Sequence, residues 1–184
     1  MTANSKFSPP EQVAPPIVAA FFTEFIPNVK NEYELLEKAN ADSPKISLPD
    51  LQMETLIFGL HCLDRAVFAH CGATYRDAFM DCAFATACEA FASALPDHSR
   101  GRFLECFKEH CHTRRREYGG MRLLPGEDGA LKDVLSYEYA KRICVDAGVH
   151  NMAVHLVMLE NANAILTMMN KIAQTLQPRN LKRE

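Results

Sequence analysis

The sequence predicts an all-α, single-domain, up-and-down bundle of five to six helices. Apolar residues recur with helical spacing over long stretches, and the connections between these stretches are short. No stretch shows the alternation typical of a strand. Short loops make neighbouring helices antiparallel, which favours a bundle. The 184 residues suffice for one domain with its own hydrophobic core.

The first part of the chain is expected to contain a lead-in and two short helices. Residues 1–16 are rich in proline and polar residues, so we expect them to be flexible, although Ser8 and Glu11 have the spacing of a capping box. Residues 17–26 are expected to form a short apolar helix, which Pro27 interrupts. Residues 28–42 continue as a more polar helix.

The remainder of the chain is expected to form longer helices, each with a recognisable end. Gly72, Gly119 and Gly148 follow three of them, and proline follows two others. We assign residues 17–177 to one bundle domain and residues 178–184 to a charged tail. The expected helices span residues 49–71, 74–95, 97–118, 130–147 and 151–177.

Composition and charge narrow the classes of function. A formal net charge of −3 predicts no basic field for nucleic acid. The N-terminus lacks the apolar region of a secretory signal, and no unbroken apolar run approaches the length of a membrane span. We therefore expect a cytoplasmic protein that binds neither nucleic acid nor membrane. Seven cysteines, an odd number, are expected to be mostly free thiols.

Asp64 interrupts the apolar face of its helix, where a lone carboxylate needs a partner. His61 and Arg65 lie within local reach. Asn161 interrupts the apolar face of the last helix in the same way, with His155 near the edge. If these helices face each other, the residues form either a ligand pocket in the core or a structural polar network that fixes helix register.

The stretch ECFKEHCHTRRREYGG combines possible metal ligands with cations. Cys106 and His110 lie one turn apart, but a closed zinc site needs four ligands. Arg114 and Arg115, with Arg122 beyond the glycines, could hold a small anion. Equally, these arginines could be ordinary cations near the C-terminal end of a helix, where positive charge interacts favourably with the helix dipole.

Small residues and thiols suggest two further roles. Ala78, Ala85 and Ala92 repeat at heptad spacing, so the N-terminal helices or a second subunit could cover this alanine strip. A redox sensor needs an exposed thiol of low pKa, and Cys62 and Cys106 are the candidates.

The residues favour a non-enzymatic function. The sequence contains no glycine-rich phosphate loop, no G-x-S-x-G, no H-E-x-x-H and no C-x-x-C. We therefore expect a helical protein that acts by association, with itself or with a protein partner. The first alternative is a bundle that holds a small ligand or cofactor, of unknown identity, around Asp64. A thiol-based redox sensor is the second alternative.

Overall fold

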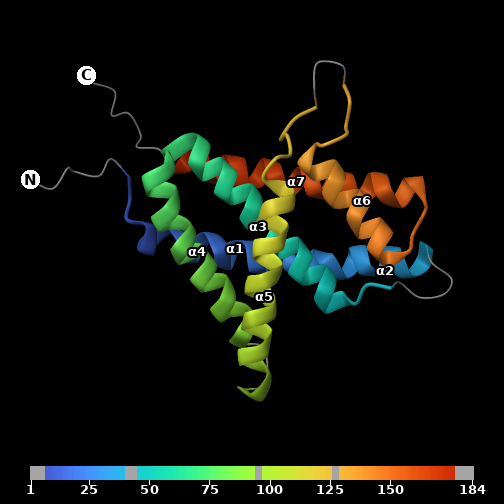
Figure 1. The fold of residues 1–184 in the computed structure, drawn as a ribbon, viewed down its shortest axis with the longest axis horizontal. Helices are drawn as coiled ribbons and strands as arrows, with labels where there is room; N and C mark the ends of the chain where they lie inside the picture. Colours follow the sequence, from blue (N-terminus) through green and yellow to red (C-terminus); the bar gives the residue numbers. More distant parts are fainter. Residues whose placement is uncertain (1–6, 40–44, 94–96, 126–128, 177–184) are drawn as a thin grey trace, which may run out of the picture.

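Seven α-helices and one short 3-10 helix make up the ordered elements of the computed structural model, which describes residues 7–39, 45–93, 97–125 and 129–176 (Figure 1). No strand occurs in these residues, which confirms the all-α prediction. In chain order the elements are α1 (Pro10–Glu24), η1 (Ile26–Asn28), α2 (Val29–Ala39), α3 (Leu48–Cys71), α4 (Ala73–Ser93), α5 (Asp97–Tyr118), α6 (Leu135–Ala147) and α7 (Met152–Thr175).

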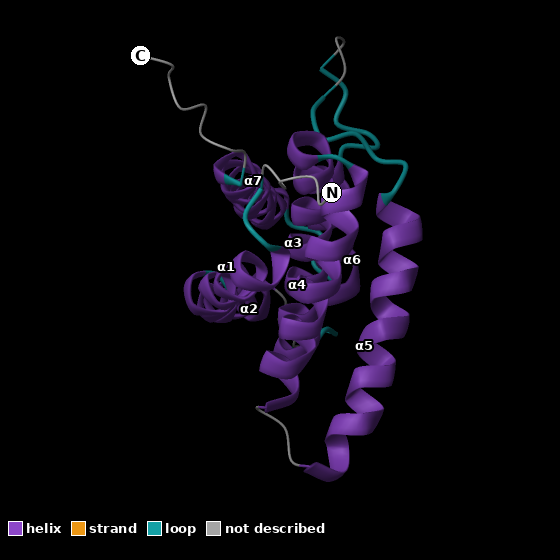
Figure 2. Cartoon of the chain, turned by 90° about the vertical axis from the view of Figure 1, so that its left-hand side faces the viewer, coloured by secondary structure: helices purple, strands orange, loops and turns teal. Residues whose placement is uncertain are grey.

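Helix α3 is the centre of the fold. It runs between α1 and α2 on one side and α6 and α7 on the other, and it contacts α2, α4, α5 and α7 (Figures 1 and 2). Almost every residue of α3 from Leu51 to Val67 is buried. The C-terminal end of α4 and the N-terminal end of α5 project beyond the other helices in Figure 1, and α5 is the outermost helix in Figure 2.

Helix α1 begins earlier than the sequence predicts. It starts at Pro10 and contains Pro15 and Pro16, so the described part of the expected lead-in, residues 7–16, is mostly helical. Prolines within a helix remove backbone hydrogen bonds. Packing overrides that cost, because α1 lies along α4 and sets Phe21 against Gly59 of α3. A Cβ atom at Gly59 would lie 2.6 Å from Cζ of Phe21, so only glycine permits this approach.

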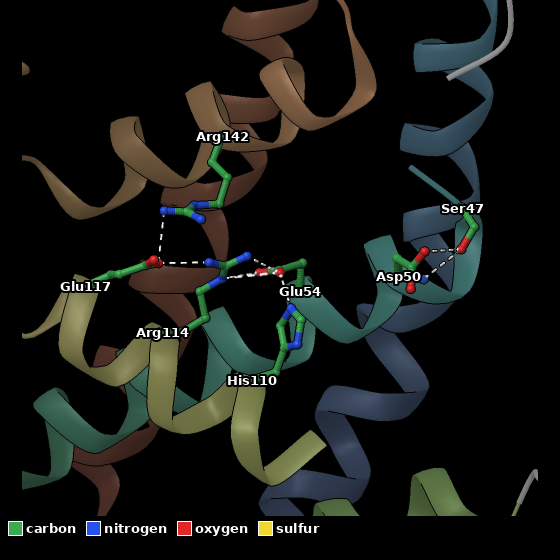
Figure 3. Close-up of polar contacts among 7 residues, drawn as sticks. All are labelled: Ser47, Asp50, Glu54, His110, Arg114, Glu117 and Arg142. Carbon is green, nitrogen blue, oxygen red and sulfur yellow. Dashed lines mark hydrogen bonds and ion pairs between the residues drawn. The ribbon is translucent and has the colours of Figure 1, made fainter. Parts of the chain in front are cut away.

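The ends of α3 follow the expected chemistry. The hydroxyl of Ser47 accepts a hydrogen bond from the backbone N–H of Asp50 at 3.3 Å, which caps the first turn (Figure 3). Gly72 ends the helix with a φ of 83°, a conformation that favours glycine. Gly148 ends α6 in the left-handed helical conformation, with a φ of 72° and a ψ of 22°.

Helix α6 begins five residues later than expected. The backbone N–H of Arg122 donates to the carbonyl of Asp133 at 2.7 Å, and the N–H of Leu135 donates to the carbonyl of Arg122 at 2.8 Å. These bonds hold residues 130–134 in a loop. Residues 126–128 and the predicted tail, 178–184, lie outside the described residues.

Helix α7 is long and apolar enough to cross a membrane by length and composition alone. Asn161 and Asn163 interrupt its apolar run, so the sequence contains no unbroken apolar stretch of that length here. The same composition suits a helix in a bundle. In the structure α7 packs against α3 and α6 and buries Val154, Met158 and Ile165.

Helix α5 is attached to α4 through aromatic side chains. The rings of Phe91 and Phe103 stack at a centroid distance of 5.2 Å. Those of Phe84 and Phe107 stack at 5.5 Å. Such pairs contribute about 0.5–1.5 kcal/mol each beyond the area they bury. They fix the first half of α5.

A buried ion pair attaches the second half of α5 to α3 (Figure 3). Nε of Arg114 donates to Oε2 of Glu54 at 2.8 Å, and both side chains are almost fully buried. Nη1 of Arg114 also donates to Glu117 at 2.8 Å, and Arg142 of α6 contacts the same carboxylate at 2.9 Å. Nε2 of His110 lies 3.2 Å from Glu54. The hydrogen bond to Glu54 raises the pKa of Arg114.

We expect Glu54→Leu and Arg114→Leu each to lower the free energy of unfolding by about 3–5 kcal/mol, because each leaves the other charge buried without its main partner. The double variant should lose much less than the sum of the two. Urea denaturation of the four proteins measures this coupling.

Lys141→Ala is the control, since Lys141 lies 3.9 Å from Glu138 and is exposed. It should change the stability by less than about 1 kcal/mol. Strictly additive losses at Glu54 and Arg114 would contradict the role given to the pair.

Candidate functional site

A cleft of about 620 Å³ lies between α3, α4 and α5, and it is called the α3–α4–α5 cleft below. Its size is typical of sites that bind small organic molecules. Its floor comes from α3, through Ile57, Leu60, His61 and Asp64. His61 and Asp64, which the sequence singled out, therefore lie at the same site.

Asp64 finds its partner on α4. Nε of Arg76 lies 2.7 Å from Oδ1 of Asp64, although its N–H is not aligned with that oxygen, so the contact is an ion pair without a good hydrogen bond. Burial raises the pKa of Asp64, and the charge of Arg76 opposes this shift. The carboxylate is thus compensated by a residue on the neighbouring helix.

His61 has a ring nitrogen that is buried without a hydrogen-bond partner among the described residues. Burial is the main cause that lowers the pKa of His61 to about 4, and the charges of Arg65 and Arg115 add to it. The imidazole is therefore neutral at pH 7. A hydrogen bond to the backbone of Tyr118 opposes the shift, as expected when the ring donates to a carbonyl. Nε2 is buried and has no hydrogen-bond partner in the described part of the chain.

The other two walls differ in character. Helix α4 contributes mainly apolar side chains, among them Met80, Phe84 and Ala85. Helix α5 contributes a stripe that contains Lys108 and Arg115. The thiols that line the cleft belong to Cys88 and Cys111. Burial raises the pKa of both thiols, that of Cys111 to about 12, so both are protonated at neutral pH.

The other residues of the predicted pocket lie elsewhere. Nδ2 of Asn161 donates to Oε1 of Glu32 on α2 at 2.9 Å. The ring of His155 lies 5.1 Å from that of Tyr137, and Arg65 donates to the carbonyl of Met121. The prediction of one polar cluster was wrong. Helical periodicity predicts on which face of its helix a residue lies. It does not predict which other helix packs against that face at that residue.

A second, smaller cavity of about 290 Å³ surrounds Glu32. Burial raises the pKa of Glu32 to about 7, against the opposing effect of the Asn161 hydrogen bond. Sequence reasoning missed this residue and Glu54. Both lie on apolar faces, three residues after a buried Val29 or Leu51. This helical spacing from a buried apolar residue is the sequence signal that could have identified Glu32 and Glu54.

The three arginines proposed as an anion site do not converge. Arg114 is engaged by Glu54, and Nη2 of Arg122 donates to the carbonyl of Lys132 at 2.7 Å. Arg115 alone of the three lines the cleft. The prediction of a joint site was wrong because consecutive residues point about 100° apart around a helix.

The structure also bears on the thiol and metal candidates. Cys62 is fully buried, and burial raises the pKa of its thiol, which is opposite to the need of a redox sensor. The sequence had placed it away from the core. Cys106 is exposed, while His110 directs its ring at Glu54. Among the described residues, no group of three or more His, Cys, Asp or Glu could hold a metal ion.

Comparisons of the chain with protein-family models, with curated proteins and with solved structures found no match. The function must therefore be inferred from the geometry of the cleft.

The pKa of His61 predicts that the protein loses stability in acid. Because folding lowers this pKa from 6.5 to about 4, the unfolded chain binds the proton more readily, and stability falls as the pH decreases through this window. The free energy of unfolding falls by about 2 kcal/mol between pH 8 and pH 5 for this reason.

His61→Phe should remove this part of the pH dependence, which urea denaturation at pH 8 and pH 5 measures. His150→Phe, at an exposed site, is the control. Unchanged pH dependence in His61→Phe would contradict the assignment.

Proposed function

We propose that this protein binds a small, largely apolar molecule in the α3–α4–α5 cleft. The observation that carries the proposal is a cleft of about 620 Å³ whose lining combines apolar side chains with His61, a ring whose buried Nε2 has no hydrogen-bond partner among the described residues. An unpaired buried polar atom costs about 1–3 kcal/mol. A ligand hydroxyl or N–H group would recover much of this free energy and fix the orientation of the ligand.

The lining supports binding rather than covalent chemistry. Ile57, Leu60 and Phe84 offer apolar contact to the body of a ligand. Arg76 compensates the charge of Asp64, so Asp64 is better suited to holding α3 against α4 than to acting as a general base. The protonated thiols of the cleft are poor nucleophiles.

Two alanines of α4 provide a matched test. Ala85 lines the cleft, whereas Ala78, one heptad earlier, is exposed without lining it. We expect the neutral fluorophore Nile red to bind the native chain with increased emission. Ala85→Trp should fill the cleft and weaken this binding by about tenfold or more. Ala78→Trp should leave it unchanged. Equal binding by both variants, or no binding to the native chain, would contradict the proposal.

Self-association is a second candidate function. Val145 of α6 and Met152 and Leu156 of α7 are 57%, 70% and 57% exposed. Exposed apolar side chains that gather at one end of a helix pair favour an interface with a second copy. The alanine strip gives less support. Helix α1 packs on α4, whose fully buried alanines are Ala83 and Ala87, whereas Ala78 and Ala85 of the strip are exposed and Ala92 is buried.

Size-exclusion chromatography with light scattering tests this candidate. We expect a dimer whose population rises with concentration, and Leu156→Glu should shift it to the monomer, because a charge there would be desolvated in the interface. Leu124→Glu is the control, since Leu124 is 73% exposed in the loop after α5. A native chain that is monomeric at every concentration would remove this candidate.

A further inference from the structure

We propose that the α3–α4–α5 cleft selects an organic acid, with its carboxylate against a basic stripe of α5 and its apolar body against α3 and α4. This inference rests on the ligand-binding function proposed above. It adds the chemical class of the ligand.

The basic stripe consists of Lys108, His112 and Arg115. Their spacing of four and three residues places them on one face of α5, and all three line the cleft. None of them makes a hydrogen bond or ion pair with another described residue. Arg114, next to Arg115 in sequence, points to Glu54 instead. Helix α5 thus uses one arginine to hold the fold and leaves the neighbouring cations to the cleft.

The acidic groups near the cleft do not fully neutralise this stripe. Asp64 is paired with Arg76. Asp81 lines the cleft from α4 and is exposed, as Lys108 and Arg115 are, so it offsets one of their two positive charges and leaves one. On α5 itself, Glu117 forms ion pairs with Arg114 and with Arg142 of α6. Glu105 and Glu109 are exposed and do not line the cleft. One positive charge of the stripe therefore remains available to an anion.

The arrangement of polar and apolar groups suits a molecule with one charged end. Arg115 acts electrostatically on both His61 and Asp64, so its charge reaches the polar end of the cleft. Leu60, Phe84 and Leu104 supply apolar surface in the same cleft. Lys108 and Arg115 carry two positive charges and Asp81 one negative charge, so the remaining single positive charge matches that of a carboxylate. The side of α5, and not its N-terminus, faces the ligand, so the set of backbone N–H groups that phosphates favour is absent from this stripe.

Three probes with the same chain length separate charge from apolar contact. Octanoate, 1-octanol and octylamine are titrated into the full chain by isothermal calorimetry. We expect octanoate to bind about tenfold more tightly than 1-octanol, and octylamine to bind most weakly. Ala85→Trp should weaken all three, which assigns the binding to the cleft.

Matched variants test the stripe itself. Lys108→Gln with Arg115→Gln should abolish the preference for octanoate while 1-octanol binds as before. Arg116→Gln, an exposed arginine that does not line the cleft, should keep the preference. Equal affinities for the three probes, or tighter binding of octylamine, would overturn the organic-acid inference and leave the ligand-binding function intact. If none of the probes binds, both proposals fail for molecules of this kind.

Discussion

The ion pair between Glu54 and Arg114 is the interaction on which the arrangement of α5 depends. Two charges taken out of water bind each other strongly only when their geometry is good, and losing either partner is costly. Here the carboxylate comes from the central helix α3, and Glu117 links the arginine to Arg142 of α6. Aromatic rings hold α5 on α4, and Tyr118 of α5 packs edge-on against Phe58 of α3, so the ion pair and this ring contact together set the distance between α5 and α3. The width of the α3–α4–α5 cleft follows from that distance.

Two consecutive residues of α5 supply the arginine of the ion pair and a charged side chain of the cleft. Consecutive residues of α5 point to different sides, so Arg114 holds the fold while Arg115 faces the cleft. The cleft lining contains groups that have no hydrogen-bond or ion-pair partner in the described part of the chain, namely Nε2 of His61, Lys108 and Arg115. Local departures of this kind from full satisfaction are expected at functional sites. A ligand that satisfies them would also stabilise the folded chain.

Helical periodicity predicted the helices and several of their ends, because Ser47, Gly72 and Gly148 act locally. It also identified His61 and Asp64 as candidate site residues, because the sequence of a single helix is enough to show a polar residue on or beside its apolar face. It did not identify the neighbours of those residues. Arg76 reaches Asp64 only when α4 packs back on α3, and Glu32 reaches Asn161 only after helices far apart in sequence have packed. The helical start of α1 was missed for a related reason, because its packing on α4 and Gly59 outweighs the local effect of Pro15 and Pro16.

The most direct measurement is the position at which small molecules bind the isotope-labelled chain, read from backbone amide shifts in a screen of small organic fragments. The account predicts that shifts cluster on residues 57–64, 80–88 and 104–115, the segments that line the cleft. Fragments that carry a carboxylate should produce the largest of them. Binding that clusters on another surface, or a chain that binds no fragment at all, would contradict the central claim that this cleft is the functional site.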